Sequence, residues 1–139
     1  LEPRLKGEGR QDKGRVLIGT VEGDIHDIGK NIVISLLKVN GYEVIDLGRD
    51  TPSTEFVDAA VDNDVGIVCI SGLLNTSLPN MRDVIQMMCD DGVRDRFKVL
   101  IGGGPTSQTF ADKIGADGYG ATAHTAVLLC DSLLGYSNN

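Results

Sequence analysis

An acid, an imidazole and a glycine stand close together in the segment 24–29, which reads DIHDIG. His26 follows Asp24 by two residues, and a neutral imidazole beside a carboxylate is a common metal-ligand arrangement. One ring nitrogen binds the metal while the other donates its proton to the carboxylate. A single histidine near a strand end is more often a hydrogen-bonded structural residue. His26 is therefore a candidate metal ligand, and motifs elsewhere in the chain must support that assignment.

The flanking patterns place this segment on a loop. Residues 16–21 are almost all apolar and predict a buried strand over about 15–21. Apolar residues then recur at helical spacing over 28–39, which predicts a helix with Lys30 turned away from the core. Its expected buried face consists of Ile28, Ile32, Val33, Leu36 and Leu37. A loop between a strand and such a helix is where ligands bind in open α/β sheets.

The remaining chain continues to alternate between strand and helix patterns. Further strands are predicted over 42–47, 65–70, 97–101 and 117–119. Further helices are predicted from about residue 53, over about 78–91, over a short stretch that ends at 114, and over 122 to about 134. Ser53 and either Thr106 or Ser107 are the expected helix N-caps. We therefore predict an α/β fold: a flavodoxin-like, doubly wound, five-stranded parallel sheet in the order 2-1-3-4-5, with helices on both faces. Residues 1–13 are polar and glycine-broken, and predict a linker or tail before a single domain over 14–139.

Composition narrows the classes of function. The net charge is −7, which argues against binding to nucleic acid or to an anionic membrane, and no apolar run is long enough to span a bilayer. Three cysteines without a CxxC motif indicate neither a disulfide framework nor a zinc site. We expect buried thiols in a cytoplasmic protein.

Two further loops carry distinctive residues and should lie on the same rim as Asp24 and His26. Ser71, Leu73 and Ser77 follow the third strand, and Gly102, Gly103 and Gly104 follow the fourth. A glycine run at a strand end indicates that something bulky approaches the backbone, although a tight turn would also explain it. Phosphate-binding motifs of the GxGxxG and GxxxxGK[ST] types are absent.

Taken together, these motifs resemble the cobalamin-binding domain of corrinoid-dependent methyltransferases. The likeness rests on Asp-x-His-x-x-Gly at 24–29, Ser-x-Leu at 71–73 and Gly-Gly at 102–103, and it covers residues 14 to about 134. The longer string GDIHDIGKN at 23–31 and the string DLG at 46–48 are similar to the branch that includes cobalamin-dependent methionine synthase and the small corrinoid carrier proteins. The string GADGY at 115–119 is most similar to the small carriers.

The resemblance implies a cobalamin cofactor, methylcobalamin or a related corrinoid, and a role for each matching residue. His26 would replace the cofactor's dimethylbenzimidazole as the lower ligand of cobalt, the base-off/His-on state. Asp24 and Ser77 would form a proton relay behind it. The displaced nucleotide tail would enter a slot in the sheet domain. The remaining residues expected to contact the cofactor are Asp27, Ile28, Gly29, Ser71, Leu73, Gly102, Gly103, Gly104, Tyr119, Gly120 and Ala121.

The function implied by this resemblance is a methyl carrier without a complete active site of its own. Its expected partners are a methyl-donor methyltransferase, an acceptor methyltransferase and a reductive activase. Two alternatives remain open: a subunit of an adenosylcobalamin-dependent mutase, and a non-enzymatic cobalamin sensor or storage domain. A response module without a corrinoid ranks last, because the phosphoryl-acceptor pattern is missing. No helical segment precedes Gly14, so we expect an excerpt of a larger protein or a domain whose upper corrin face a partner covers.

Overall fold

The computed structural model describes residues 14–23, 28–72, 74–103, 106–120 and 122–134. The predicted linker over residues 1–13 lies outside this part of the chain. The strands are β2 (Gly14–Thr20), β3 (Tyr42–Asp46), β4 (Ile67–Ser71), β5 (Lys98–Gly102) and β6 (Gly118–Tyr119). The helices are α1 (Ile28–Val39), α2 (Ser53–Asp62), α3 (Leu78–Asp90), α4 (Gln108–Ile114) and α5 (Ala123–Leu133). Two short 3-10 turns, Asn75–Ser77 and Arg94–Arg96, precede α3 and β5 and were not predicted.

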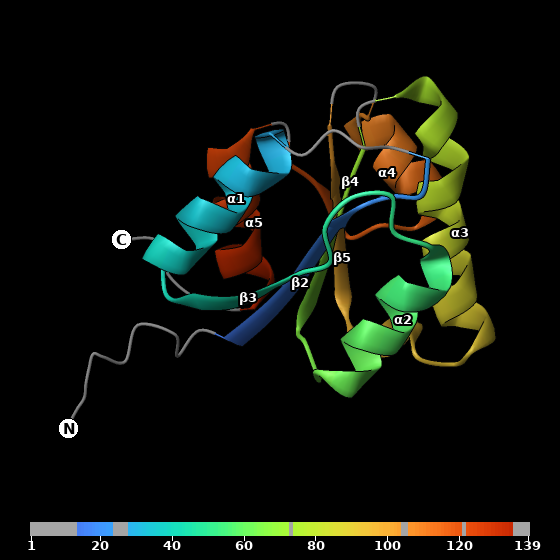
Figure 1. Ribbon diagram of the computed structural model, residues 1–139, viewed down its shortest axis with the longest axis horizontal. Helices are drawn as coiled ribbons and strands as arrows, with labels where there is room; N and C mark the ends of the chain where they lie inside the picture. The colour runs from blue at the N-terminus through green and yellow to red at the C-terminus, as the bar shows by residue number, and fades with distance from the viewer. Residues whose placement is uncertain (1–13, 24–27, 73, 104–105, 121, 135–139) are drawn as a thin grey trace.

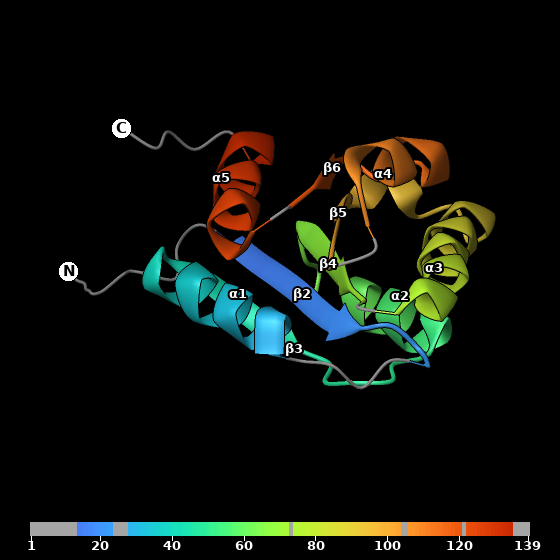
Figure 2. The same ribbon diagram turned by 90° about the horizontal axis from the view of Figure 1, so that it is seen from above.

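The five strands form one sheet in the order β3-β2-β4-β5-β6, and every neighbouring pair is parallel. This is the predicted order 2-1-3-4-5, so the predicted flavodoxin-like architecture is confirmed. Figures 1 and 2 show α1 and α5 on one face of the sheet and α2, α3 and α4 on the other. β2 and β4 are neighbours at the point where the strand order reverses, which is where such folds bind ligands.

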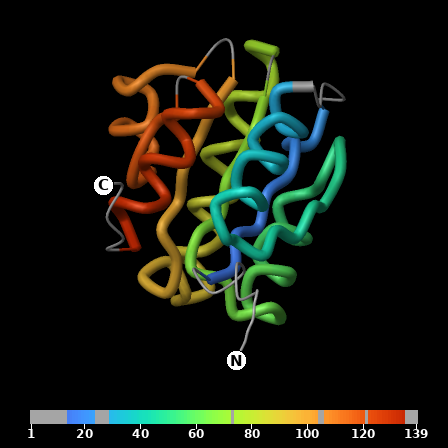
Figure 3. Tube along the Cα trace, turned by 90° about the vertical axis from the view of Figure 1, so that its left-hand side faces the viewer, coloured from blue at the N-terminus to red at the C-terminus, as the bar shows by residue number. Residues whose placement is uncertain are grey.

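Each face of the sheet has its own apolar core, because successive side chains of a strand point to opposite faces. Leu17, Val68 and Val99 pack under α2, α3 and α4. Ile67 and Leu100 pack on the opposite face with residues of α1 and α5. Figure 3 shows these two helices side by side over that face. The central strands are therefore covered on both faces, as their nearly continuous apolar sequences predicted.

The orientation of α1 differs from the prediction. Ile32 is 51% exposed, whereas Lys30, Ile34 and Leu37 are buried. Lys30, Ile34 and Leu37 follow one another at i, i+4 and i+7, which is the spacing of a single helix face. The predicted outward position of Lys30 was wrong, because apolar residues occur on most sides of this helix and the sequence alone did not select the stripe that faces the sheet.

Helix caps and cysteines were predicted with mixed success. Ser107 caps α4 by accepting a hydrogen bond from the Phe110 backbone N–H. Ser53 is the first residue of α2 rather than its cap, because the Pro52 carbonyl already accepts the first helical hydrogen bonds. Cys69 and Cys130 are buried free thiols, but the expectation of burial was wrong for Cys89, which lies on the outer face of α3.

Candidate functional site

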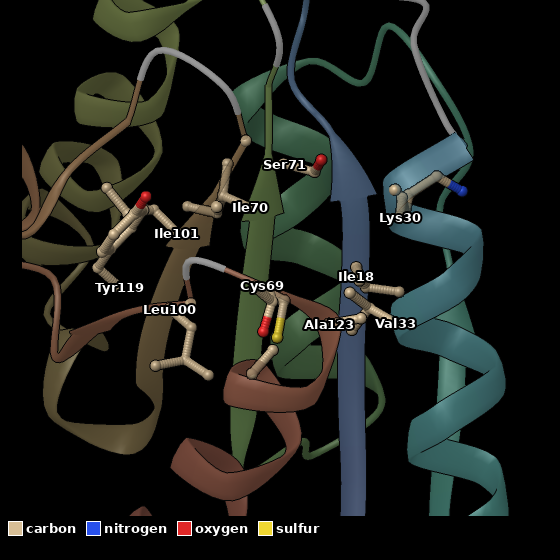
Figure 4. A pocket seen from close by; sticks show the side chains of 16 residues that line it. Ile18, Lys30, Val33, Cys69, Ile70, Ser71, Leu100, Ile101, Tyr119 and Ala123 are labelled. Carbon is tan, nitrogen blue, oxygen red and sulfur yellow. The ribbon is translucent and has the colours of Figure 1, made fainter.

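A cavity of about 410 Å³ opens at the carboxyl end of the sheet, on the face covered by α1 and α5. Figure 4 shows β2, β4 and β5 forming its back, with α1 on one side. The volume falls within the usual range of about 300–1,000 Å³ for small-molecule and cofactor sites. The lining residues are Ile18, Gly29, Lys30, Val33, Cys69, Ile70, Ser71, Leu100, Ile101, Gly102, Gly103, Tyr119, Gly120, Thr122, Ala123 and Ala126.

The sheet side of the cavity has two levels that the strand register defines. Ser71 pairs with Gly102 at the level nearest the strand ends. Two residues earlier in the strands, Cys69 pairs with Ile18 of β2 on one side and with Leu100 of β5 on the other. At about 3.3 Å per residue, this second level lies roughly 7 Å deeper. The cavity therefore has a polar and small-residue rim above an apolar floor.

Six of the predicted cofactor-binding residues meet in this cavity although they come from different loops. These are Gly29, Ser71, Gly102, Gly103, Tyr119 and Gly120. Ser77 is buried at the start of α3, where its hydroxyl donates to the Leu74 carbonyl, and it does not form part of the wall. The predictions for Asp24, His26, Asp27, Leu73, Gly104 and Ala121, and for the side chain of Ile28, fall outside the described residues and stay predictions.

The backbone conformation and a neighbouring strand end require glycine at position 103, whether or not a ligand binds. Its φ is +125°, a backbone conformation that L side chains rarely adopt, and a Cβ there would lie 1.7 Å from the Gly72 carbonyl oxygen. The tight-turn explanation of the glycine run is thus sufficient for Gly103. Gly102 is restricted less severely, because a Cβ there would lie 3.1 Å from the Gly120 carbonyl oxygen. Its pairing partner Ser71 faces the cavity, and neighbouring residues of parallel strands share a face. A side chain at Gly102 would enter the mouth of the cavity.

At Gly29, unlike Gly103, the described fold has room for a side chain. A Cβ added at this position would meet no described atom within 4 Å, and its φ is not in the left-handed region. The described fold therefore gives no reason for glycine in the first turn of α1. Its place on the cavity wall does give one, because a side chain there would reduce the space available to a ligand.

Lys30 is a site residue that the sequence analysis missed. Its side chain is 1% exposed, and its Nζ lies 2.7 Å from Oδ1 of Asp46, whose side chain is 43% exposed. Figure 4 shows the Lys30 nitrogen turned away from the labelled floor residues, so the aliphatic stem forms the wall. Partial burial alone would raise the pKa of the Asp46 carboxyl. Hydrogen bonds from Lys30 and the Gly48 N–H, with the nearby lysine charges, outweigh burial and lower that pKa.

Fixed contacts also hold the residues on either side of the segment 24–27. The Gly23 N–H donates to Asp50 at 2.7 Å, and the Asn80 side-chain amide donates to the Glu22 carbonyl at 2.5 Å. On the other side, the Lys30–Asp46 pair ties α1 to β3. α3, β3 and the loop after β3 thus anchor the two flanks of the segment that carries the candidate ligand His26.

We expect Asp46→Asn to lower the free energy of unfolding at pH 7 by about 1–2 kcal/mol, because the buried Lys30 charge loses its ionic partner while water still reaches the position. Because the pKa of Asp46 is lowered in the folded state, its carboxylate stabilises the fold at pH values above its usual pKa of 3.8. This contribution is lost as the pH falls through the lowered, folded-state pKa. Urea denaturation from pH 7 to pH 3 measures this, and the difference from the parent chain should shrink below about pH 4.

The matched control for this substitution is Glu43→Gln. Glu43 pairs with Arg15 at 3.3 Å, and both side chains are about half exposed. Exposed pairs contribute about 0–1 kcal/mol, so the control should change stability less than Asp46→Asn does. Equal losses in the two variants would contradict the assigned role of the Lys30–Asp46 pair.

Comparison with known proteins identifies the family. The profile of the B12 binding domain matches residues 14–128 of this chain. The chain belongs to the B12-binding domain family. A corrinoid protein of Desulfitobacterium hafniense is 46% identical over 97% of this chain and 64% of its own length. A dimethylamine corrinoid protein of Methanosarcina acetivorans is 45% identical over 96% of this chain and 63% of its own length. The chain thus spans slightly less than two thirds of these relatives.

Solved structures agree with this assignment. A cobalamin-binding protein from Desulfitobacterium hafniense superposes with a TM-score of 0.83 at 37% identity, over 86% of this chain and 58% of the other. The monomethylamine corrinoid protein of Methanosarcina barkeri gives 0.85 at 29% identity, over 90% and 60%. A response-regulator receiver domain from Mycobacterium tuberculosis gives 0.62 at 15% identity, over 88% and 96%, which shows a shared fold alone.

The predicted resemblance and the predicted cofactor class are confirmed by these comparisons. The family is defined by B12 binding, and several relatives are corrinoid proteins. The described part of this B12-binding domain contains no cluster of three or more His, Cys, Asp or Glu that could hold a metal ion. Among its described helices, none is long and apolar enough to cross a membrane.

Proposed function

We propose that this B12-binding domain is a corrinoid methyl carrier that works with partner methyltransferases. The observation that carries the proposal is the cavity itself, where Gly29, Ser71, Gly102 and Tyr119 meet at the carboxyl end of a sheet of this family. When bound, the corrinoid supplies a cobalt centre that accepts a methyl group from one partner's substrate and gives it to another's. The protein holds and orients that centre.

A single histidine ligand from the protein is enough for a metal that is already held by a macrocycle. A corrin ring supplies four nitrogen ligands, so the protein needs to provide only one axial ligand. His26, in the segment between β2 and α1, would bind cobalt, with Asp24 and Ser77 as its proton relay. The Ser77 hydroxyl, which donates to the Leu74 carbonyl in the corrinoid-free structure, would turn to Asp24 in that relay. A ligand whose second nitrogen is hydrogen-bonded has its basicity tuned by that partner.

The cavity fits the nucleotide tail of a corrinoid bound in the base-off/His-on state. The floor of Ile18, Cys69 and Leu100 is apolar and suits the flat face of a benzimidazole. The Ser71 hydroxyl at the rim is placed to hydrogen-bond a ring nitrogen or the sugar. The open wall at Gly29 and the bare backbone at Gly102 give the tail its entry between sheet and helices.

The names of similar proteins support the proposed classes of partner. Relatives include dimethylamine corrinoid proteins, and a chain of the methanol:cobalamin methyltransferase complex of Methanosarcina barkeri superposes with a TM-score of 0.83 at 35% identity, over 90% of this chain and 48% of that one. The proposed partners are a methyltransferase that takes the methyl group from a small donor of the methanol or methylamine class, a second that passes it on, and a reductive activase.

The test is single-turnover methyl transfer with the corrinoid-loaded chain. The bound corrinoid is first reduced to its Co(I) form with a low-potential chemical reductant. A donor methyltransferase of the methanol or methylamine class is then added with its substrate, and transfer of the methyl group to cobalt is followed by the visible spectrum. The proposal expects stoichiometric methylation. Turnover of adenosylcobalamin with an acyl-thioester partner would favour the mutase alternative instead. Light-dependent oligomerisation without methyl transfer would favour the sensor alternative.

We expect Gly29→Ala to stabilise the corrinoid-free chain by about 0.4–1 kcal/mol, because alanine restricts the unfolded chain and meets no described neighbour. The same variant should bind hydroxocobalamin more weakly, because the new methyl group enters the cavity wall. Thermal denaturation and equilibrium dialysis measure the two effects. Unchanged corrinoid affinity would contradict the role of Gly29 in admitting the cofactor.

A further inference from the structure

We infer that Cys69 sets the depth of the cavity and thereby the size of the lower base that a bound corrinoid can carry. The inference rests on the proposed function, in which the nucleotide tail enters this cavity. It adds a specificity-determining residue that contacts the tail at its far end, away from cobalt.

The register places Cys69 at the centre of the cavity floor. It lies on β4, the middle strand of the three that form the floor, and pairs with Ile18 of β2 and Leu100 of β5. Figure 4 shows all three side chains on the face that carries α1 and α5. Cys69 is the smallest of the three, and it is 6% exposed. A base that enters past Ser71 therefore reaches its greatest depth over the Cys69 side chain.

The level beneath Cys69 cannot accommodate a longer ligand. Two residues further down the strands, Val16 pairs with Ile67, and both are fully buried in the core shared with α1 and α5. Close-packed cores resist expansion. The position of Cys69 thus marks where open space ends and packed core begins.

A second cysteine lies near Cys69 in the same apolar core. The fully buried Cys130 of α5 lies within hydrogen-bonding reach of the Cys69 thiol and belongs to the same core. That contact, followed by burial, raises the pKa of the Cys69 thiol well above its usual range, so the floor stays uncharged. An uncharged floor of one thiol and two branched aliphatic side chains suits a benzimidazole better than a purine, whose extra polar atoms would lack partners there.

The test compares binding of two corrinoids that differ only below the ring. Cobalamin carries the nucleotide tail, whereas cobinamide has the same corrin without it. For Cys69→Leu, overpacking of about 1.4–2.8 kcal/mol corresponds to a roughly 10- to 100-fold weaker Kd for cobalamin. The Kd for cobinamide should stay within about threefold of the parent value, since that ligand does not reach the floor. Equal weakening for both ligands, or no change for either, would overturn the inference.

Two further variants keep the test decisive. Cys89→Leu makes the same replacement on the exposed face of α3 and should change neither affinity. Cys69→Ala deepens the floor, and we expect it to improve binding of a cobamide with a naphthimidazole base relative to cobalamin. If Cys69→Leu does not fold, an unchanged ratio in Cys69→Ala overturns the inference. A parent chain that binds neither cobalamin nor cobinamide would refute the proposed function instead, so the two failures are distinguishable.

Discussion

His26→Ala is expected to weaken corrinoid binding by at least about 10- to 100-fold and to abolish the histidine-on spectrum of whatever corrinoid is retained. Loss of even an outer partner of a metal ligand typically has an effect of that size, so loss of the ligand should have no less. The proposed cavity for the nucleotide tail is unchanged in this variant, because its described lining includes residues of β4, β5 and α5 that the substitution does not alter. Residual binding without the axial imidazole is therefore the expected outcome.

Visible absorption of the loaded variant, compared with the parent chain across pH 5–9, measures this effect. His124→Ala is the matched control, because the chain has only two histidines and His124 is exposed in the first turn of α5. The control should keep the parent spectrum. A His26→Ala protein with an unchanged spectrum would remove the ligand assignment, and an altered His124→Ala spectrum would transfer it to α5.

Gly103→Ala is expected to lower the free energy of unfolding by about 3 kcal/mol or more, because it combines a rare backbone conformation with a backbone collision. The added Cβ would lie 1.7 Å from the Gly72 carbonyl oxygen and 2.7 Å from its carbon, so β4 and β5 must separate at the point where the cavity opens. The Gly72 N–H donates to the Gly102 carbonyl across the same gap. Urea denaturation of the corrinoid-free chain measures the loss.

Gly92→Ala separates the two causes. Gly92 also has a positive φ, +74°, but a Cβ there would meet nothing within 4 Å among the described residues. Its expected loss is about 1 kcal/mol, the cost of the left-handed conformation alone. If Gly103→Ala costs no more than Gly92→Ala, the close approach of Gly72 is not what requires glycine at position 103.

The fold was largely predictable because its signals are local. Apolar runs for buried parallel strands and helical spacing between them fix the alternation, and short right-handed connections leave few strand orders. The predicted bounds of α1 and the cap at Ser107 are confirmed because each depends on neighbouring residues. The meeting of Ser71, Gly102 and Tyr119 in one cavity was predictable for a related reason, since parallel strands present their carboxyl ends at one edge.

Two features were not predictable: the rotation of each helix about its own axis, and how deeply an individual side chain is buried. Periodicity could not select the inner face of α1, so Lys30 was placed outside although it is buried against Asp46. Cys89 has the same residue type as Cys69 and Cys130, and composition alone could not distinguish an exposed helix face from the core. The proposed role of Cys69 at the cavity floor depends on the register across three strands, which the sequence does not specify before the sheet is formed.

The measurement that tests the central claim most directly is electron paramagnetic resonance of the chain loaded with cobalamin reduced to its Co(II) form, with and without ¹⁵N-labelled histidine. Coordination by His26 predicts that the nitrogen superhyperfine splitting changes from a triplet to a doublet when the histidine is labelled. A triplet that persists in the labelled protein would mean that the cofactor's own benzimidazole remains on cobalt, and it would contradict a bound state in which this chain supplies the lower ligand.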